Sequence, residues 1–318
     1  MSKEQIAVAE LITNIILGKT NGTSRVDFFP QKPEFPFEKP YEQPFPRATP
    51  ESQGISSDML ADLLRDLDTS RYTDMHHFMV LRNGKVICEA NFAPYRSRIW
   101  HVTHSMCKSI TGMAIGLLVE EGKLSLDENI YDIFQKNLNP FTKIFRPKIT
   151  VENLLTMTSG VTFNESGIIS GNDWLTSYIN SSITGTPGES FQYNSLNTYV
   201  LSAIVTERTG LTLTEYLEPR LFTPLGITRY FWETCPKGIT KGGWGLFLCT
   251  EDMAKLGQLY LQKGKWQGQQ IIPEFWVEVS TAKHKESVEG TFGYGYQLWM
   301  ESRPGSFEFN GMLGQNVI

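Results

Sequence analysis

A serine and a lysine stand three positions apart, at Ser105 and Lys108, where an apolar stretch of the chain begins. Residues with this spacing lie side by side on one face of a helix. A serine hydroxyl is a weak nucleophile at neutral pH, but a neighbouring lysine amine that is held neutral can accept its proton. The pair therefore predicts a nucleophile and its base. The alternative is an ordinary core helix with a capping serine and a solvated lysine.

The residues after Ser105 predict a buried helix that would hold this pair in place. Apolar side chains recur at helical spacing, at Ile110, Met113, Ala114, Leu117 and Leu118. The stretch is far shorter than the roughly 20 residues that a membrane span needs. We therefore expect a core helix, whose positive N-terminal dipole would favour negative charge developing beside the serine.

A tyrosine supplies a third candidate for proton transfer. Tyr193 lies in the segment 191–195, between a turn-like stretch at 186–189 and a helical run that begins near Thr198. A phenol close to a lysine loses its proton more easily and can act as a proton shuttle. Most tyrosines are simply packed with their hydroxyl satisfied. Together with Ser105 and Lys108, however, Tyr193 forms a candidate Ser-Lys-Tyr triad.

These motifs, taken in order, resemble those of the serine β-lactamase-related family, which includes class C β-lactamases, family VIII esterases and nylon-oligomer (aminohexanoate-dimer) hydrolases. Ser-x-x-Lys is the nucleophile motif of penicillin-recognising enzymes. The resemblance runs from about Thr49 to Ile318. It is also carried by the segments 81–85, 154–160, 242–245, 251–254 and 294–299, of which the last three resemble the nylon-oligomer hydrolases most.

The resemblance implies an α+β fold, with an antiparallel sheet flanked by helices, an inserted helical domain and the site between them. Residues 1–50 would form an N-terminal helix and a proline-rich arm, 51–130 and 242–318 the α/β part, and 131–241 the mainly helical insertion. Relatives continue with further antiparallel strands and a C-terminal helix, which are missing here. Either the sequence is a piece of a longer protein, or a sheet edge is left uncovered.

The family's third motif, Lys-Thr-Gly or His-x-Gly on a strand that lines the site, is matched here by Met312-Leu313-Gly314. The cation that binds a β-lactam or peptide carboxylate is therefore replaced by methionine. The resemblance implies an oxyanion hole made of the backbone N–H groups of Ser105 and Gln315. The residues expected to contact substrate are Ser195, which stands at the Asn position of the β-lactamase Tyr-x-Asn motif, Met312, Leu313 and Gly314.

Composition excludes several other classes of function. The chain has 29 basic and 34 acidic residues, a net charge of −5, which disfavours nucleic acid and anionic membranes as partners. Its four cysteines lack zinc or disulfide spacing, and no His-Glu-x-x-His pattern occurs. We therefore expect no metal and no cofactor, with thiols that stay reduced in a cytoplasm.

The N-terminal region predicts location and association. Residues 1–19 contain Glu4 and Glu10 and no small-residue cleavage site, unlike a signal peptide, so a cytoplasmic protein is expected. Residues 4–17 predict an amphipathic helix, and 28–50 an extended arm in which prolines alternate with aromatic residues. These aromatic side chains need a surface to pack on, either on their own domain or on a second copy in a homo-oligomer.

The sequence thus predicts a metal-free serine hydrolase that forms an acyl-enzyme with small esters or amides. A β-lactamase or D-Ala-D-Ala peptidase is the alternative enzyme, against which Met312, Ser195 and the lack of an export signal count. A catalytically inactive, β-lactamase-like binding or scaffold protein is the alternative from a different class.

Overall fold

The computed structural model describes residues 41–318, except 141, 143–145, 288–291, 301–302 and 304. The helix predicted at 4–17 and most of the proline-rich arm therefore lie outside the described residues. The last part of the arm is described, and it lies against the body of the protein. Phe45 is buried there, with its ring centroid 5.8 Å from that of Trp266.

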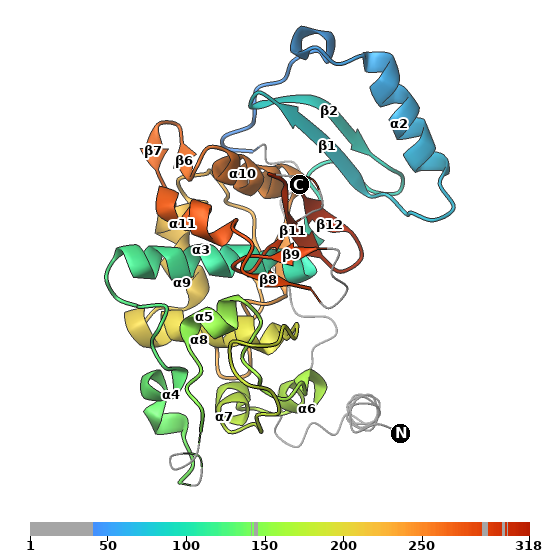
Figure 1. Ribbon diagram of the computed structural model, residues 1–318. Coiled ribbons are helices and arrows are strands. Elements are labelled where there is room, and N and C mark those ends of the chain that lie inside the picture. The colour runs from blue at the N-terminus through green and yellow to red at the C-terminus, as the bar shows by residue number, and fades with distance from the viewer. Residues whose placement is uncertain (1–40, 141, 143–145, 288–291, 301–302, 304) are drawn as a thin grey trace.

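Two long helices, α3 (Cys107–Glu120) and α8 (Ser195–Thr209), pack against each other at the centre of the molecule (Figure 1). Both are buried on nearly all sides, as expected for helices within a core. The helix predicted to follow Ser105 is therefore confirmed as α3. The backbone of α3 also comes close to another helix, because a Cβ atom added at Gly116 would lie 2.3 Å from the Trp276 ring.

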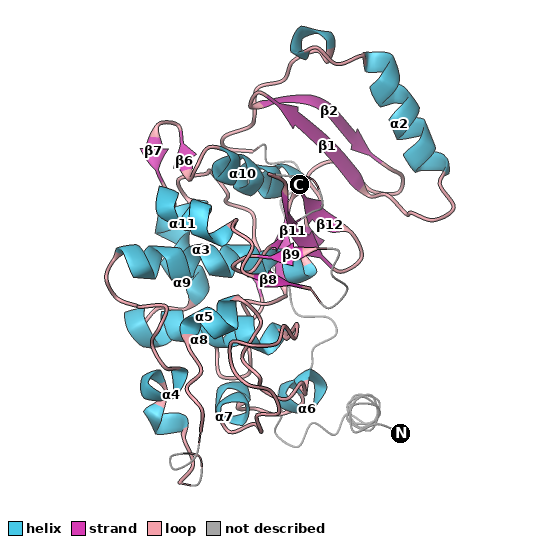
Figure 2. Cartoon of the chain, viewed as in Figure 1, coloured by secondary structure: helices cyan, strands magenta, loops and turns pink. Residues whose placement is uncertain are grey.

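The remaining helices lie around this pair, except α2, which lies apart from it at the upper right of the view (Figures 1 and 2). They are α2 (Ser57–Thr69), α4 (Ile130–Ile133), α5 (Val151–Leu155), α6 (Glu165–Ile169), α7 (Trp174–Ile179), α9 (Leu213–Leu217), α10 (Thr250–Leu261) and α11 (Glu274–Ser280). Single helical turns occur at η1 (Glu51–Gln53), η2 (His104–Met106), η3 (Gln135–Asn137) and η4 (Glu218–Phe222). Ser56 caps α2 by accepting a hydrogen bond from the Met59 N–H at 3.4 Å.

The strands of the described residues form four antiparallel sheets. The largest has the order β12-β11-β10-β9-β8, and a second has the order β3-β5-β4. The large sheet comprises β8 (Lys285–Glu286), β9 (Gly293–Tyr294), β10 (Trp299–Met300), β11 (Phe307–Gly311) and β12 (Gln315–Val317). The second comprises β3 (His101–Val102), β4 (Phe231–Trp232) and β5 (Leu246–Leu248), and a small hairpin comprises β6 (Lys265–Trp266) and β7 (Gln269–Gln270). The mix of helices with antiparallel sheets is the α+β class that the sequence predicted.

The N-terminal hairpin, β1 (His77–Arg82) and β2 (Lys85–Asn91), turns at Asn83-Gly84. Both turn residues have positive φ angles, 51° and 71°, as the Asn-Gly signal predicted. Strand β1 packs against α10, which also contacts β12. The arm is tied to the same helix, because Arg47 and the Phe45 N–H both bind the carboxylate of Glu251.

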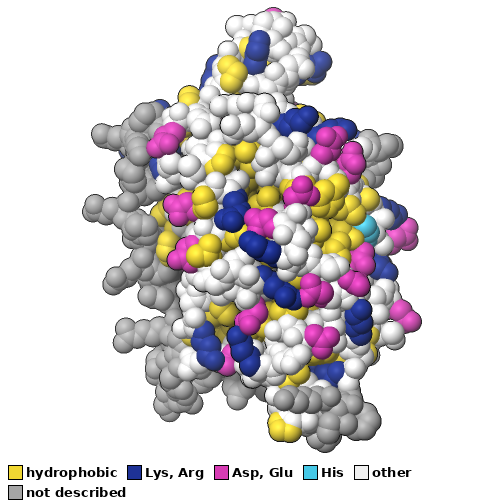
Figure 3. All heavy atoms as spheres, turned by 90° about the vertical axis from the view of Figure 1, so that its left-hand side faces the viewer, with side chains coloured by type: hydrophobic (Ala, Val, Ile, Leu, Met, Phe, Trp, Pro, Cys, Tyr) yellow, Lys and Arg dark blue, Asp and Glu magenta, His cyan; other side chains and the backbone are white. Residues whose placement is uncertain are grey.

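The described residues from α4 to α9 form helices and loops (Figure 2). Strand β4 follows further along the chain and pairs with β5. The division of the chain into three parts remains a prediction. Figure 3 shows acidic and basic side chains interspersed over one face of the molecule. In the part of the chain that the structure describes, every helix is too short or too polar to cross a bilayer.

Candidate active site

Ser105 lies in the η2 turn, between β3 and α3. This turn is anchored to β5, because the Thr103 N–H and hydroxyl both donate to the Leu246 carbonyl, at 2.7 and 3.0 Å. His104, the residue before the serine, has a φ angle of +45°, which non-glycine residues adopt only where their surroundings enforce it. The serine is thus held in a constrained turn directly before the central helix.

Lys108 projects from the first turn of α3 into a buried cradle of three oxygen atoms. Its Nζ lies 2.9 Å from Ser105 Oγ, 3.2 Å from Ser195 Oγ and 2.6 Å from the Gly243 carbonyl oxygen. The side chain is 1% exposed, so it is not the solvated lysine of the alternative interpretation. A neutral amine here could donate to Gly243 and Ser195 and still accept the Ser105 proton through its lone pair.

The Gly242-Gly243 segment is bound to α3 and leaves room for nothing larger than glycine. The Gly242 carbonyl accepts hydrogen bonds from Thr111 Oγ1 at 2.8 Å and from Cys107 Sγ at 3.3 Å. A Cβ atom at Gly243 would lie 2.8 Å from the Ser195 carbonyl oxygen and 3.5 Å from Lys108 Nζ. Sequence reasoning noted this glycine pair but missed its contact with the lysine, because a backbone carbonyl has no residue type that signals it.

Tyr193 lies beside the lysine, and its role as the third member of a Ser-Lys-Tyr triad remains a prediction. Lys108 Nζ is 5.1 Å from the centroid of the Tyr193 ring. The ring is stacked on Trp299 of β10, with centroids 5.7 Å apart and an interplanar angle of 20°. Tyr294 packs edge-on against both rings. One wall of the site is therefore aromatic, and strands β9 and β10 position it.

Ser195 is the first residue of α8, and its position is fixed from two directions. Asn194 caps the helix by accepting the Leu196 N–H at 3.0 Å, and the Glu165 carboxylate accepts the Ser195 N–H. Glu165 is half-buried in α6. No pattern in the sequence singled out Glu165, since it contacts the site through a backbone atom.

The hairpin of β11 and β12 differs from the expectation for the third motif. Met312, Leu313 and Gly314 form the turn between the two strands and do not lie on a strand. The physical reason is the positive φ angle of Leu313 and of Gly314, 73° and 92°, which ends the strand at Gly311. The predicted strand position was therefore wrong, and Met312 and Leu313 are 63% and 83% exposed.

The strand that contacts the nucleophile turn is β11 at Gly311. A Cβ atom there would lie only 2.4 Å from the Thr103 carbonyl oxygen. Gln315 pairs with Gly311 across the hairpin, which places the start of β12 near the same turn. The oxyanion-hole role of the Ser105 and Gln315 N–H groups remains a prediction, as do substrate contacts by Met312, Leu313 and Gly314.

Two further titratable groups flank the nucleophile. Burial, and then the neighbouring Lys108, lower the pKa of His104, so its ring is neutral at neutral pH. Burial raises the pKa of Cys107 to about 12, so its thiol is protonated and unreactive. Among the described residues, no three or more His, Cys, Asp or Glu side chains are grouped so that they could hold a metal ion.

The family model described as Beta-lactamase matches residues 61–318. The chain belongs to this family. A 6-aminohexanoate-dimer hydrolase from Paenarthrobacter ureafaciens is 27% identical in an alignment of 224 residues that covers 63% of this chain and 55% of that protein. The chain therefore spans about half the length of that relative. Protein flp of Staphylococcus aureus is 30% identical in an alignment of 135 residues that covers 39% of this chain and 26% of that protein.

Solved structures of this family share the fold. A provisionally named 6-aminohexanoate-dimer hydrolase from Bacillus anthracis superposes with a TM-score of 0.69 at 25% identity, over 86% of this chain and 78% of that chain. The octameric penicillin-binding protein homologue from Pyrococcus abyssi gives 0.65 at 22% identity, over 82% and 69%. At this identity, the second likeness concerns the fold alone.

Proposed function

We propose that the protein is a serine hydrolase that forms an acyl-enzyme with carboxylic esters or small amides. The observation that carries this proposal is the 2.9 Å contact between Ser105 Oγ and Lys108 Nζ inside a buried cradle. Nucleophile and base within hydrogen-bonding distance, with the base oriented by other groups, are the signature of an activated nucleophile. The likeness to a 6-aminohexanoate-dimer hydrolase, whose name denotes a hydrolytic enzyme, supports the same class of reaction.

In this mechanism Ser105 Oγ attacks the substrate carbonyl carbon while its proton passes to Lys108 Nζ. The oxyanion that forms is held by the backbone N–H groups of Ser105 and Gln315. Tyr193 and Lys108 then pass a proton to the leaving alcohol or amine as the bond to the carbonyl carbon breaks. Water attacks the resulting ester of Ser105, releases the acid and restores the serine hydroxyl.

Esters and small amides fit the site better than β-lactams do. A β-lactam carries a carboxylate, and Met312, in the position expected for the partner cation, is an exposed side chain in a turn. A charge-assisted hydrogen bond of that kind is worth about 1.5–3 kcal/mol, or about ten- to a hundredfold in specificity.

The test is to compare kcat/KM for p-nitrophenyl butyrate and nitrocefin, with Ser105→Ala as the blank for both. We expect the ester to be preferred by at least about tenfold. Comparable values for the two substrates would contradict the proposed preference. If Ser105→Ala kept both activities, the mechanism itself would be contradicted.

A further inference from the structure

The first turn of α8 connects the cradle of Lys108 to a carboxylate. Ser195 is the first residue of this helix, and its Oγ lies 3.2 Å from Lys108 Nζ. A backbone N–H at this position has no acceptor inside its own helix, so its partner must come from elsewhere. The partner of the Ser195 N–H is the carboxylate of Glu165, 30 positions earlier in the chain. A single residue, Ser195, therefore links Glu165 to the lysine.

Glu165 reaches Ser195 from a short helix that is anchored in the core. It is the first residue of α6, and Ile168, one turn further on, is buried. The start of α6 is tightly packed, because a Cβ atom at Gly167 would lie 2.5 Å from Asn164 Oδ1. Helix α6 also packs against α7. The half-buried carboxylate is thus presented to α8 from a fixed support.

The position of the Ser195 hydroxyl matters because Lys108 must keep one orientation. Nζ also contacts Ser105 Oγ at 2.9 Å and the Gly243 carbonyl oxygen at 2.6 Å. For a neutral amine to direct its lone pair at Ser105, its N–H bonds must point at the other two oxygen atoms. If the Ser195 hydroxyl moved away, the amine could turn, and the Ser105 proton would lose its aligned acceptor.

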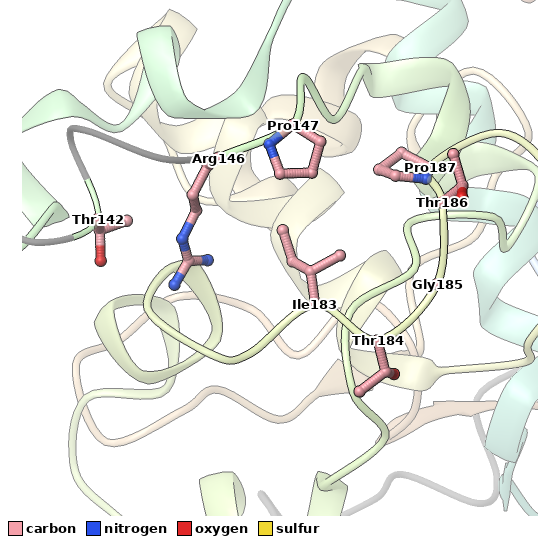
Figure 4. A pocket seen from close by; sticks show the side chains of 8 residues that line it. All are labelled: Thr142, Arg146, Pro147, Ile183, Thr184, Gly185, Thr186 and Pro187. Carbon is pink, nitrogen blue, oxygen red and sulfur yellow. The ribbon is translucent and has the colours of Figure 1, made fainter.

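A cavity elsewhere in the helical part does not contribute to this cradle. It has a volume of about 570 Å³ and lies between Arg146 and the segment 183–187 (Figure 4). Ser105, Lys108 and Ser195 are not among the residues that line it. A ligand in this cavity would leave the contacts of Lys108 unchanged, so the orientation of the amine depends on the groups bonded to it.

We propose that Glu165 is a positioning residue for the proton transfer from Ser105 to Lys108. Its carboxylate accepts the Ser195 N–H, which fixes the Ser195 hydroxyl against Lys108 Nζ and leaves the amine lone pair directed at Ser105 Oγ. This inference rests on the proposed function, because it assigns a role in that reaction. Glu165 acts as a hydrogen-bond acceptor, and its negative charge is not required.

Two conservative variants separate the acceptor from the charge. Glu165→Gln keeps an oxygen atom at the same reach and loses the charge, whereas Glu165→Asp keeps the charge on a side chain one methylene group shorter. The readouts are kcat/KM for p-nitrophenyl butyrate and the rate at which a fluorophosphonate labels Ser105. We expect Glu165→Gln to stay within about threefold of the wild type in both, since a neutral acceptor makes a weaker but aligned hydrogen bond. Glu165→Asp should lower both by about 5- to 20-fold.

A double variant tests whether Glu165 acts through Ser195. In a Ser195→Ala background the hydroxyl is already absent, so adding Glu165→Asp should cost less than about a further twofold in kcat/KM. Additive losses would overturn the proposal, because Glu165 would then act by another route. Urea unfolding of each variant separates a loss of stability from a loss of rate. A folded Glu165→Asp that reacts as fast as the wild type would also overturn the proposal.

Glu215→Asp is the matched control, because Glu215 accepts a backbone N–H, that of Thr212 at 2.8 Å, at the start of α9 instead of α8. It should leave kcat/KM and the labelling rate unchanged, and an equal loss there would show a purely structural role. Glu165→Gln that loses as much as Glu165→Asp would show that the charge matters, against the proposal. Failure of the proposed function is different: the wild-type protein would then neither hydrolyse the ester nor take up label on Ser105.

Discussion

Removing the hydroxyl of Ser195 tests the cradle that holds Lys108. In Ser195→Ala, Lys108 Nζ loses its contact with the Ser195 hydroxyl at 3.2 Å and keeps those with Ser105 Oγ at 2.9 Å and the Gly243 carbonyl oxygen at 2.6 Å. A buried N–H left without a partner costs about 1–3 kcal/mol. If the cost falls on the transition state, in which the amine must hold one orientation, kcat should drop by about 5- to 150-fold.

The assay is steady-state hydrolysis of p-nitrophenyl butyrate, with unfolding in urea measured in parallel. Ser195→Thr keeps a hydroxyl and should retain most of the activity. Ser202→Ala is the matched control, because it removes another buried hydroxyl from α8, one that donates to the Thr240 carbonyl at 2.6 Å. It should reduce stability without a specific effect on kcat. The reasoning is refuted if Ser195→Ala keeps kcat within about twofold, or if Ser202→Ala lowers it equally.

Three more predictions concern stability, pH and proton transfer. Arg47→Ala should lower the free energy of unfolding in urea by about 3–5 kcal/mol. The reason is that the fully buried Glu251 carboxylate loses its two contacts with the guanidinium, at 2.9 and 2.7 Å. A loss below about 1 kcal/mol would mean that the pair behaves like a surface ion pair. Burial, and then neighbouring histidines, lower the pKa of His101 to about 4, so the stability that its neutral form contributes is present above about pH 6.5 and is lost as pH falls toward 4. For this half-buried ring we expect the free energy of unfolding to fall by about 1–3 kcal/mol over that pH range, and to fall by less in His101→Asn. If the stability of His101→Asn depended on pH as that of the wild type does, His101 would not be the group responsible. Lys108→Ala, Tyr193→Phe and the double variant should show non-additive losses in log kcat, because both groups handle one proton; additive losses would indicate independent roles.

The local elements were predictable because their signals lie close together in the sequence. The spacing of Ser105 and Lys108 and the apolar periodicity after them predicted the helix and a shared face, and the structure places the two side chains in contact. The hairpin at Asn83-Gly84 followed from turn chemistry in the same way. A helix or a hairpin turn of this kind can be predicted from a few residues that are neighbours in the sequence.

The rest of the site depends on contacts that are distant in sequence. The Gly243 carbonyl binds a lysine 135 positions away, and Glu165 holds a backbone N–H 30 positions away. Neither contact has a local signal. The strand expected at Met312–Gly314 was wrong. Apolar residues such as these occur both in strands and in turns, and the positive φ angles of Leu313 and Gly314 make this segment a turn. Motif order alone could not reveal those angles.

Intact-mass spectrometry after labelling with a fluorophosphonate tests the central claim most directly. We expect the wild-type protein to gain one adduct, with peptide mapping that places it on Ser105, and Ser105→Ala to remain unlabelled while it unfolds at the same urea concentration. A wild-type chain that takes up no label under conditions where it is folded would indicate a catalytically inactive, β-lactamase-like binding protein. Label that persists in Ser105→Ala on another serine would contradict the assignment of the nucleophile.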